Sequence, residues 1–283
     1  MTSLLRAAIE RLDAAGVDSP EWDAEQLAAL VAGVPRSRLA LVAHLDAAQT
    51  QRFDELVAQR AQRVPLQHLT GSVGFRYIEL EVGAGVFVPR PETEVVAGIA
   101  IDHARAACDA PVVVDLCSGS GAIALSVANE IPSAQVHAVE LDPDAVTWLR
   151  RNAAARRTAG DAPVTVHCDD AEHALPAFNG RVDVVVANPP YVAADELLHV
   201  DPEVRDHDPR VALVADDDGL AVIRQVSATA MRLLRPGSWV VVEHSDRQGE
   251  SATDVLVAAG FVDVADTDDL AGRPRAASGR KPQ

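Results

Sequence analysis

The fold is decided by the stretch Val112-Val113-Val114-Asp115-Leu116-Cys117-Ser118-Gly119-Ser120-Gly121. Residues 112–116 form a short apolar run that is typical of a buried parallel strand. Residues 122–130, which follow the two glycines, show the amphipathic pattern of a helix. A strand, a glycine turn and a helix amino terminus form the first unit of a doubly wound α/β domain.

The alternation of strand and helix continues downstream. The predicted strands are residues 112–116, 135–139, 164–168, 182–187, 239–243, 262–265 and 275–278. The predicted helices are residues 94–107, 122–130, 143–155, 220–234 and 250–259, with a turn at Arg235-Pro236-Gly237. We therefore expect an α/β fold with a doubly wound, Rossmann-like sheet of about seven strands, whose last two strands form a reversed hairpin at its edge.

The amino-terminal part of the chain has a different pattern. Apolar residues recur at intervals of three and four between residues 3 and 63, which predicts several helices. Gly16 and Gly33 are predicted helix ends, and Ser19-Pro20 is a predicted helix start. We expect a small N-terminal helical domain at residues 1–72.

A second change of pattern begins at residue 64. Residues 75–82 alternate in part, and residues 86–88 form another apolar run after two glycines, which predicts a β-hairpin. We expect this hairpin to form a linker at residues 73–92, followed by the α/β domain at residues 93–283.

Asn188-Pro189-Pro190-Tyr191 follows the buried strand predicted at residues 182–187. The two prolines have no N–H, so carbonyl oxygens remain without adjacent donors beside the Asn188 amide oxygen. Such an acceptor-rich corner suits a planar amino group, with Tyr191 covering the group that bears it. The alternative is that this tetrapeptide only ends the strand, because Asn and Pro are common loop residues.

Polar residues follow several of the predicted strands. Glu140 lies 19 residues after Gly121, where dinucleotide-binding folds place an acidic residue on the ribose hydroxyls. Ligands of open parallel sheets bind beyond the carboxyl ends of the strands. One crevice is therefore expected to hold Asp115, Gly119, Gly121, Glu140, Asp169, Asp170 and Asn188.

Two loops near this edge have open interpretations. The acidic stretch at residues 192–218 is longer than ordinary connections and is either a lid or a flexible surface loop. In the stiff loop at residues 89–94, Glu92 or Thr93 caps the next helix, or Arg90 faces a ligand.

Composition narrows the class of protein. The net charge of −17, with Lys281 as the single lysine, disfavours stable nucleic-acid binding. No apolar run is long enough to span a membrane, and the first residues lack the apolar segment of a signal peptide, which predicts a cytoplasmic protein. The three cysteines and nine histidines show no metal-ligand spacing, so we expect no metal and free thiols.

Three motifs together identify a family resemblance: PLQHLTGSVGF with FVPRPETE (65–75 and 87–94), DLCSGSGAIAL (115–125) and NPPY (188–191). The chain resembles the release-factor glutamine N5-methyltransferases, which are class I S-adenosylmethionine-dependent enzymes. The resemblance implies methyl transfer from S-adenosyl-L-methionine, giving S-adenosyl-L-homocysteine, to the glutamine of the Gly-Gly-Gln motif in class I peptide chain release factors.

The same resemblance implies a set of site residues. The cofactor-binding residues would be Asp115, Cys117, Ser118, Gly119, Ser120, Gly121, Glu140, Asp169, Asp170 and Asn188. The catalytic and substrate-binding residues would be Asn188, Pro189, Pro190 and Tyr191, and we also expect Phe87 and Arg90 to contact the substrate. The chain departs from the family pattern at Cys117 and Ser245, where glycine is usual.

Three other functions remain open from the sequence. NPPY also occurs in methyltransferases that act on exocyclic amines of DNA or ribosomal RNA. A non-catalytic cofactor-binding adaptor would need the helical domain but not the Asn188 corner. A nicotinamide oxidoreductase is disfavoured because position 117 is cysteine, which breaks the G-x-G-x-x-G pattern.

Overall fold

The computed structural model describes residues 1–216 and 218–283, so Asp217 of the predicted acidic loop lies outside the described residues. The chain divides into two compact units. A helical unit comprises Met1–Ser72 and Val200–His207, and an α/β unit comprises Val73–His199 and Asp208–Gln283. Over the described residues, no helix is both long enough and apolar enough to cross a membrane.

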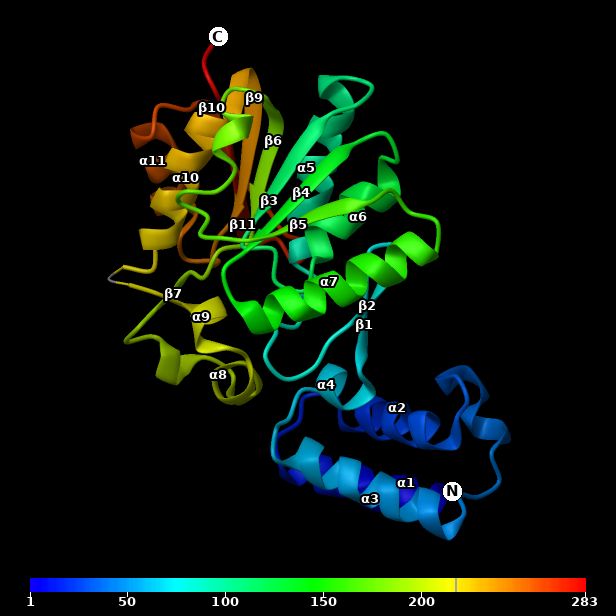
Figure 1. Ribbon diagram of the computed structural model, residues 1–283. Helices are drawn as coiled ribbons and strands as arrows, with labels where there is room; N and C mark the ends of the chain where they lie inside the picture. Colours follow the sequence, from blue (N-terminus) through cyan, green and yellow to red (C-terminus); the bar gives the residue numbers. More distant parts are fainter. Residues whose placement is uncertain (217) are drawn as a thin grey trace. The chain divides into compact units, whose positions relative to one another are not determined.

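The helical unit confirms the helical periodicity of the amino-terminal residues. Its elements are α1 (Thr2–Ala14), α2 (Pro20–Ala32), the 3-10 helix η1 (Arg36–Leu41), α3 (Ala47–Ala61) and α4 (Leu66–Thr70), drawn in blue to cyan in Figure 1. Leu12, Leu27 and Phe53 are fully buried in its core. Gly33 ends α2 in the left-handed conformation, with φ of 67°, as expected. Ser19 precedes Pro20, but its side chain makes no capping hydrogen bond.

A short helix from the distant acidic stretch, α8 (Pro202–His207), belongs to this helical unit. Arg60 of α3 is 4% exposed, and its Nε lies 2.6 Å from Asp23 Oδ2 in α2. Its Nη2 lies 2.6 Å from Glu203 Oε1 in α8. Arg63 adds ion pairs to Glu203 and Asp201. A buried guanidinium therefore joins two N-terminal helices, α2 and α3, to a helix that is far away in the sequence, α8.

The α/β unit contains the predicted seven-stranded sheet, with strand order β10-β11-β9-β6-β3-β4-β5. The strands are β3 (Val112–Leu116), β4 (Gln135–Glu140), β5 (Val164–Cys168), β6 (Val182–Ala187), β9 (Leu234–Glu243), β10 (Val262–Asp268) and β11 (Pro274–Arg280). The helices are α5 (Thr93–Ala107), α6 (Ala122–Glu130), α7 (Pro143–Thr158), α10 (Ala221–Leu233) and α11 (Gly249–Ala258), with a 3-10 turn at Pro176–Phe178. They cover the sheet in layers (Figure 1).

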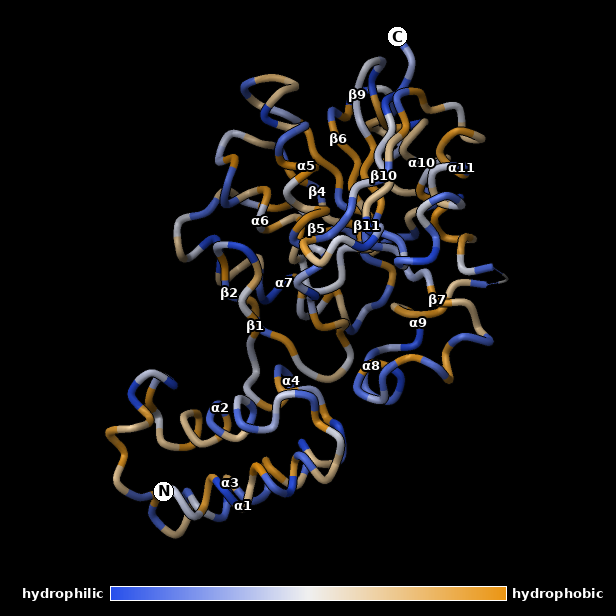
Figure 2. Tube along the Cα trace, turned by 180° about the vertical axis from the view of Figure 1, so that it is seen from behind, coloured by the Kyte–Doolittle hydropathy of each residue, from blue (hydrophilic) through white to orange (hydrophobic). Residues whose placement is uncertain are grey.

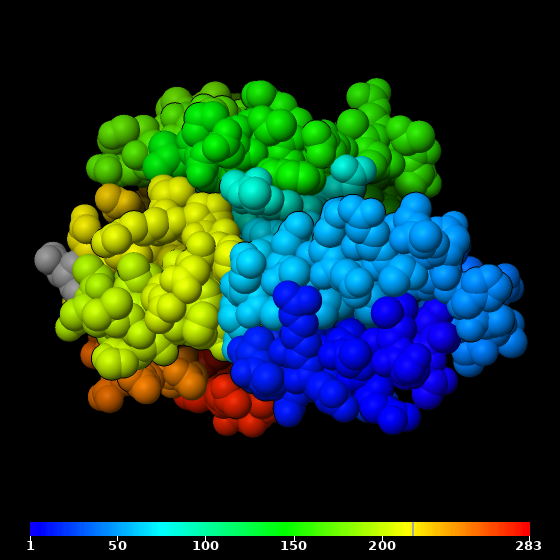
Figure 3. Space-filling model, turned by 90° about the horizontal axis from the view of Figure 1, so that it is seen from below, coloured from blue at the N-terminus to red at the C-terminus, as the bar shows by residue number. Residues whose placement is uncertain are grey.

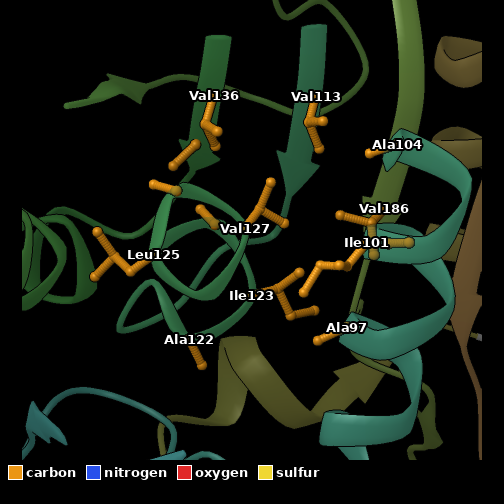
Figure 4. Close-up of a cluster of buried hydrophobic side chains, with 14 of the residues drawn as sticks. Ala97, Ile101, Ala104, Val113, Ala122, Ile123, Leu125, Val127, Val136 and Val186 are labelled. Carbon is orange, nitrogen blue, oxygen red and sulfur yellow. The ribbon is translucent and has the colours of Figure 1, made fainter. Parts of the chain in front are cut away.

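Each face of the sheet has its own apolar core. Helices α5 and α6 pack through residues such as Ile101 and Ile123 on alternate strand residues, including Val113 and Val186 (Figure 4). Helices α10 and α11 pack on the opposite face. Strand β6 is buried at every position and is mostly hydrophobic in Figure 2, as expected for a central parallel strand.

Asp183 is the polar exception within β6. Its Oδ2 accepts a hydrogen bond from the Val112 amide at the start of β3, 2.8 Å away. Its Oδ1 lies 3.1 Å from Arg235 Nη1. The buried carboxylate is therefore satisfied by an adjacent strand and a cation, as a buried charge requires.

Three local predictions were wrong in detail. The hairpin pairs β1 (Ser72–Phe75) with β2 (Ile78–Glu81), and residues 86–88 are not a strand. The turn of this hairpin is at Arg76, which has φ of 51°, rather than at the predicted glycines. The second strand, β2, ends at Glu81, before Gly83. The predicted turn at 235–237 is instead an irregularity inside β9, where the pairing register with β6 shifts.

The carboxy-terminal hairpin lies at the edge of the sheet, as expected, and the structure shows which of its strands joins the sheet. β11 is antiparallel to both β9 and β10, so it is the reversed strand but occupies an interior position. Only β10 is at the edge, and β10 runs in the direction of the parallel strands. A hairpin predicted from sequence does not specify which of its strands pairs with the sheet.

The acidic stretch at residues 192–218 contains short elements of structure. These are β7 (Val192–Ala193), a 3-10 turn (Leu197–His199), α8, α9 (Arg210–Leu213) and β8 (Val214–Ala215), which pairs with β7. Residues 194–201 are mostly exposed, in the yellow-green part of Figure 3. That residues 192–218 act as a lid over the site stays a prediction.

The Arg60 ion pairs predict a strong dependence of the helical unit on this side chain. Replacing Arg60 with Met leaves Asp23 buried without its cation, which lowers the free energy of unfolding by about 3–5 kcal/mol. Urea unfolding followed by circular dichroism measures the loss. Arg52→Met is the matched control, because the Arg52–Glu55 pair is 56% and 48% exposed, and exposed pairs contribute less than about 1 kcal/mol. Equal losses in the two variants would contradict the assignment.

Candidate active site

The site is built where the strand order of the sheet reverses. β3 pairs with β4 on one side and with β6 on the other, and Leu116 lies opposite Ala187 in register. The chain leaves these two strands at Cys117 and Asn188, so the glycine turn and the NPPY corner begin side by side. This is the topological switch point at which doubly wound sheets bind ligands.

The glycine turn is held by the carboxylate at the end of β4. Glu140 Oε2 accepts a hydrogen bond from the Gly119 amide at 2.7 Å, and Glu140 Oε1 accepts one from the Asp142 amide at 2.9 Å. Burial raises the pKa of Glu140, although these backbone donors oppose the shift. Glu140 is therefore placed beside the turn, as expected, and also orders it.

The two glycines of the turn serve different purposes. Gly119 has φ of 55°, and a Cβ there would project into open space, which leaves room for a ligand against the backbone. Gly121 has φ of 93°, and a Cβ there would come within 2.5 Å of Leu149. Gly121 is thus required by the packing of α7, while Gly119 lines open space.

Cys117 adopts φ of 62°, so the turn accepts a left-handed residue where the family usually has glycine. Its side chain packs against the α10 face of the sheet. Burial, followed by the charges of Glu140, Asp115 and Asp170, raises the pKa of its thiol.

Asp115 is a buried carboxylate with one free acceptor. Its Oδ2 accepts a hydrogen bond from the Ala124 amide at 3.1 Å, whereas its Oδ1 has no partner among the described residues. Burial raises its pKa to about 7. Since buried polar atoms are normally satisfied, the orphaned oxygen points to a donor or cation supplied by a ligand.

The remaining predicted cofactor residues flank this turn. The Ser118 amide donates to the Val139 carbonyl, and the Ser120 carbonyl accepts from Asn152 Nδ2. Asp169 and Asp170 are exposed at the end of β5, and the Asp169 amide donates to the Glu140 carbonyl at 3.0 Å. Each predicted cofactor residue thus lies on the glycine turn or on a strand end of the same sheet edge.

The NPPY corner is anchored by a residue of the PRPETE loop. Asn188 Nδ2 donates to Thr93 Oγ1 at 3.3 Å, and Thr93 is buried at the start of α5. Thr93 and Glu92 make no capping hydrogen bond to α5, so the predicted capping role was wrong. Among the described residues, no donor contacts Asn188 Oδ1.

Tyr191 is the last residue of the NPPY corner, and hydrogen bonds hold both its hydroxyl and its backbone carbonyl. Its hydroxyl lies 3.4 Å from Glu243 Oε1, and its carbonyl accepts a hydrogen bond from Gln248 Nε2 at 3.1 Å. A Cβ on Gly219 would come within 2.5 Å of that carbonyl, so glycine allows the chain to pass close by. Ser245, the second departure from the family pattern, donates its amide to Gln248 and needs no positive φ.

Phe87 and Arg90, the expected substrate contacts, interact with each other and with a buried acid. Arg90 Nη2 lies 2.7 Å from Asp208 Oδ2, and its guanidinium lies 5.0 Å from the centre of the Phe87 ring. Asp208 is 6% exposed. These contacts order the loop that contains Thr93, and the direct contact with substrate stays a prediction.

Comparison with known proteins places the chain in a family. The PrmC N-terminal domain matches residues 3–71, and the methyltransferase small domain matches residues 93–201. A release factor glutamine methyltransferase of Streptomyces coelicolor is 52% identical over 97% of this chain and 95% of its own length. One from Mycolicibacterium smegmatis is 45% identical over the same shares, and one from Bifidobacterium longum is 39% identical over 97% of both chains.

The chain belongs to the release factor glutamine methyltransferase family. The resemblance read from the PRPETE, glycine-turn and NPPY motifs is therefore confirmed. The nicotinamide alternative is excluded by membership of this methyltransferase family.

Sequence reasoning about this methyltransferase missed Glu243, Gln248 and Asp208. Glu243 ends an apolar strand at the ligand-binding edge, so the rule that selected Glu140 and Asn188 could have found it. Gln248 and Asp208 act through long-range contacts and gave no sequence signal. Within the described residues, no group of three or more His, Cys, Asp or Glu side chains could hold a metal ion.

The thiols of this methyltransferase should differ in reactivity. Cys108 and Cys168 are exposed, whereas Cys117 is partly buried with a raised thiol pKa. Only a thiolate reacts with a disulfide reagent, so two thiols should react rapidly in the native protein and the third only after denaturation. A spectrophotometric thiol titration measures both phases. Three equivalent native thiols would contradict the described turn.

Proposed function

We propose that this chain transfers a methyl group from S-adenosyl-L-methionine to the side-chain amide nitrogen, N5, of the glutamine in the Gly-Gly-Gln motif of class I release factors. The supporting observation is the orientation of Asn188, whose Nδ2 is engaged by Thr93 while its Oδ1 accepts no bond from a described residue. Family membership supports the same substrate class. Such a substrate would place the enzyme in the cytoplasm.

In this proposal the NPPY corner holds the substrate amide. Asn188 Oδ1 accepts one N–H, and the Pro189 carbonyl accepts the other. Pro190 has no N–H, and its ring fixes the backbone direction. Tyr191, held by Glu243 and Gln248, packs on the planar amide.

The two acceptors also explain how a poor nucleophile would react. An amide nitrogen shares its lone pair with its carbonyl, so it must become pyramidal and gain positive charge during transfer. Fixed acceptors on its two hydrogens stabilise that charge more than they stabilise the planar ground state. A preorganised dipole of this kind contributes about 3 kcal/mol, by analogy with an oxyanion-hole donor. The methylated nitrogen is acidic and loses its proton to water.

The glycine turn and its neighbours fit S-adenosyl-L-methionine. The orphaned Asp115 Oδ1 suits the cofactor's ammonium group, and the open space beside Gly119 suits a chain that crosses the backbone. Glu140 would accept from the ribose hydroxyls, and Asp169 and Asp170 would flank the adenine. When bound, the cofactor supplies an electrophilic methyl group on sulfur, so the protein needs neither a nucleophile nor a metal.

We also propose that residues 1–72 recognise the release factor. The net charge of −17 disfavours a nucleic-acid substrate, because affinity for nucleic acid depends on contacts between Lys or Arg side chains and phosphates. Helix α8 brings part of the stretch that follows the NPPY corner into the helical unit. Residues 200–207, which lie nine residues or more after Tyr191, are therefore part of the proposed recognition unit.

The deciding experiment incubates the protein with methyl-labelled cofactor and a purified class I release factor. Mass spectrometry should locate the label on the glutamine of the Gly-Gly-Gln motif. In Asn188→Ala, transfer should fall by about a hundredfold or more, while calorimetric affinity for the cofactor stays nearly unchanged. Label found in DNA or ribosomal RNA would overturn the substrate assignment, and near-normal turnover of the variant would overturn the role of Asn188.

The assignment of Glu140 to the ribose has its own test. Replacing Glu140 with Gln removes the charged acceptors of the ribose hydroxyls. The binding free energy of the cofactor should become less favourable by roughly 1.5–3 kcal/mol, which weakens binding about ten- to 150-fold. Calorimetry with S-adenosyl-L-homocysteine measures the affinity. Glu172→Gln is the control, because it removes the same charge from an exposed position after β5. Unchanged affinity in Glu140→Gln would remove this residue from the site.

A further inference from the structure

One side chain of α7 is hydrogen-bonded to both the glycine turn and the β1–β2 hairpin. Asn152 is 2% exposed. Its Nδ2 donates to the Ser120 carbonyl in the glycine turn and to the Glu81 carbonyl at the end of β2, each at 3.0 Å. Its Oδ1 accepts from the Glu81 amide at 2.8 Å. The amide group of Asn152 has two hydrogens, so its donors are used completely, with one acceptor on each segment.

In the glycine turn, Asn152 fixes the peptide unit between Ser120 and Gly121. The carbonyl of this unit accepts from Asn152, and its N–H donates to the Ser118 carbonyl at 2.8 Å. A peptide unit is planar, so bonds at its two ends set its orientation. Gly119, which lines the open space proposed for the cofactor, directly precedes this unit. Asn152 therefore orders the turn beside the proposed cofactor site without facing that site.

In the hairpin, Asn152 pairs with both backbone groups of Glu81, as a neighbouring strand would. β1 and β2 form a sheet of only two strands, and an isolated hairpin of this size is marginally stable. β1 begins at Ser72, the residue at which the first segment of the helical unit ends. The hairpin that Asn152 stabilises is thus a covalent continuation of the proposed recognition unit.

The apolar contacts of α7 join the same two segments. A Cβ on Gly121 of the turn would come within 2.5 Å of Leu149, and a Cβ on Gly83 after β2 would come within 2.7 Å of Trp148. Trp148 Nε1 donates to the Ala84 carbonyl at 3.2 Å. Both segments pack closely on one helix, and close-packed interiors transmit displacement. Asn152 thus adds polar bonds to a contact that already includes both segments.

We propose that Asn152 is a positioning residue that couples the hairpin to the glycine turn, so that cofactor binding and the order of β2 stabilise each other. This inference rests on the proposed cofactor site but not on the identity of the methyl acceptor. A ligand that orders the turn fixes the Ser120 carbonyl, which favours the Asn152 orientation that also pairs with Glu81. By linkage, contacts that order the hairpin strengthen cofactor binding by the same factor.

Hydrogen exchange of the Glu81 amide measures this coupling in the parent protein. Selective ¹⁵N-glutamate labelling gives the signal of this amide, and Glu81→Gln identifies it by its disappearance. Saturating S-adenosyl-L-homocysteine should slow the exchange about three- to thirtyfold, the usual range of coupling through residues that do not contact the ligand. This readout needs no methyl acceptor.

Asn152→Asp separates coupling from a general gain in stability. The aspartate still accepts from the Glu81 amide but has no hydrogen to donate to the Ser120 carbonyl. The Glu81 amide should therefore stay protected in this variant and no longer respond to S-adenosyl-L-homocysteine. Asn129→Asp is the matched control, because Asn129 Nδ2 donates to Asp161 Oδ1 at 3.0 Å, and the response of Glu81 should persist in it.

Calorimetric affinity for S-adenosyl-L-homocysteine tests the coupling in the other direction. Asn152→Asp should bind the ligand roughly three- to thirtyfold more weakly than the parent protein. Glu81→Pro, which removes only the N–H that Asn152 accepts, should weaken binding about threefold or more. Adding Glu81→Pro to Asn152→Asp should weaken binding by less than about twofold, since both changes break one network.

Glu81→Gln is the control for the side chain of Glu81. It keeps the backbone N–H and removes only the ion pair with Arg151, whose side chains are 52% and 51% exposed. Because exposed pairs contribute little, affinity should stay within about twofold of the parent protein. Circular dichroism identifies the temperature range in which each variant is folded, and the titrations are made within it.

Several results would overturn the coupling through Asn152. They are an unchanged exchange of the Glu81 amide in the parent protein, an equal response in Asn152→Asp, an unchanged affinity in Asn152→Asp, or an equal loss in Asn129→Asp. A parent protein that does not bind S-adenosyl-L-homocysteine would overturn both the cofactor assignment and this inference. Coupling observed without methylation of a release factor would reject the proposed substrate and retain the inference.

Discussion

The pairing of β3 with β6 is the constraint on which the site depends. Strand order reverses here, so two chain segments leave the same edge of the sheet as neighbours. The glycine turn follows one strand and the NPPY corner follows the other. A buried β6 and the Asp183 bond to the start of β3 hold this register. A methyl donor on one segment and an acceptor on the other would thereby be brought together.

The charges at this edge are arranged around acceptors that lack partners. Asp115 and Glu243 are each about 1% exposed, and each has one carboxylate oxygen without a hydrogen bond among the described residues. Burial raises the pKa of both to about 7. Perturbed acids of this kind cluster at functional sites. In our proposal Asp115 meets the cofactor, while Glu243 holds the hydroxyl of Tyr191 in the NPPY corner.

The helical unit depends on a different electrostatic arrangement. Arg60 is buried between two carboxylates, so its charge is compensated by Asp23 from within the unit and by Glu203 from a segment about 140 residues away. His207 ends the part of that segment that belongs to the helical unit, whereas Asp208 belongs to the α/β unit and binds Arg90. The stretch after the NPPY corner thus contributes ion pairs to both units.

The sequence by itself determined the seven-stranded α/β fold, the helical amino-terminal unit, the glycine turn and the polar residues at strand ends, because periodicity and turn chemistry are local properties. It also placed the chain in its family through contiguous motifs. Only the tertiary structure decided that Thr93 accepts a hydrogen bond from Asn188 and makes no cap on α5, that Arg60 binds Glu203 of α8, and that β11 lies inside the sheet. These outcomes depend on hydrogen bonds and ion pairs between residues far apart in the chain, whose partners are selected by burial rather than by spacing.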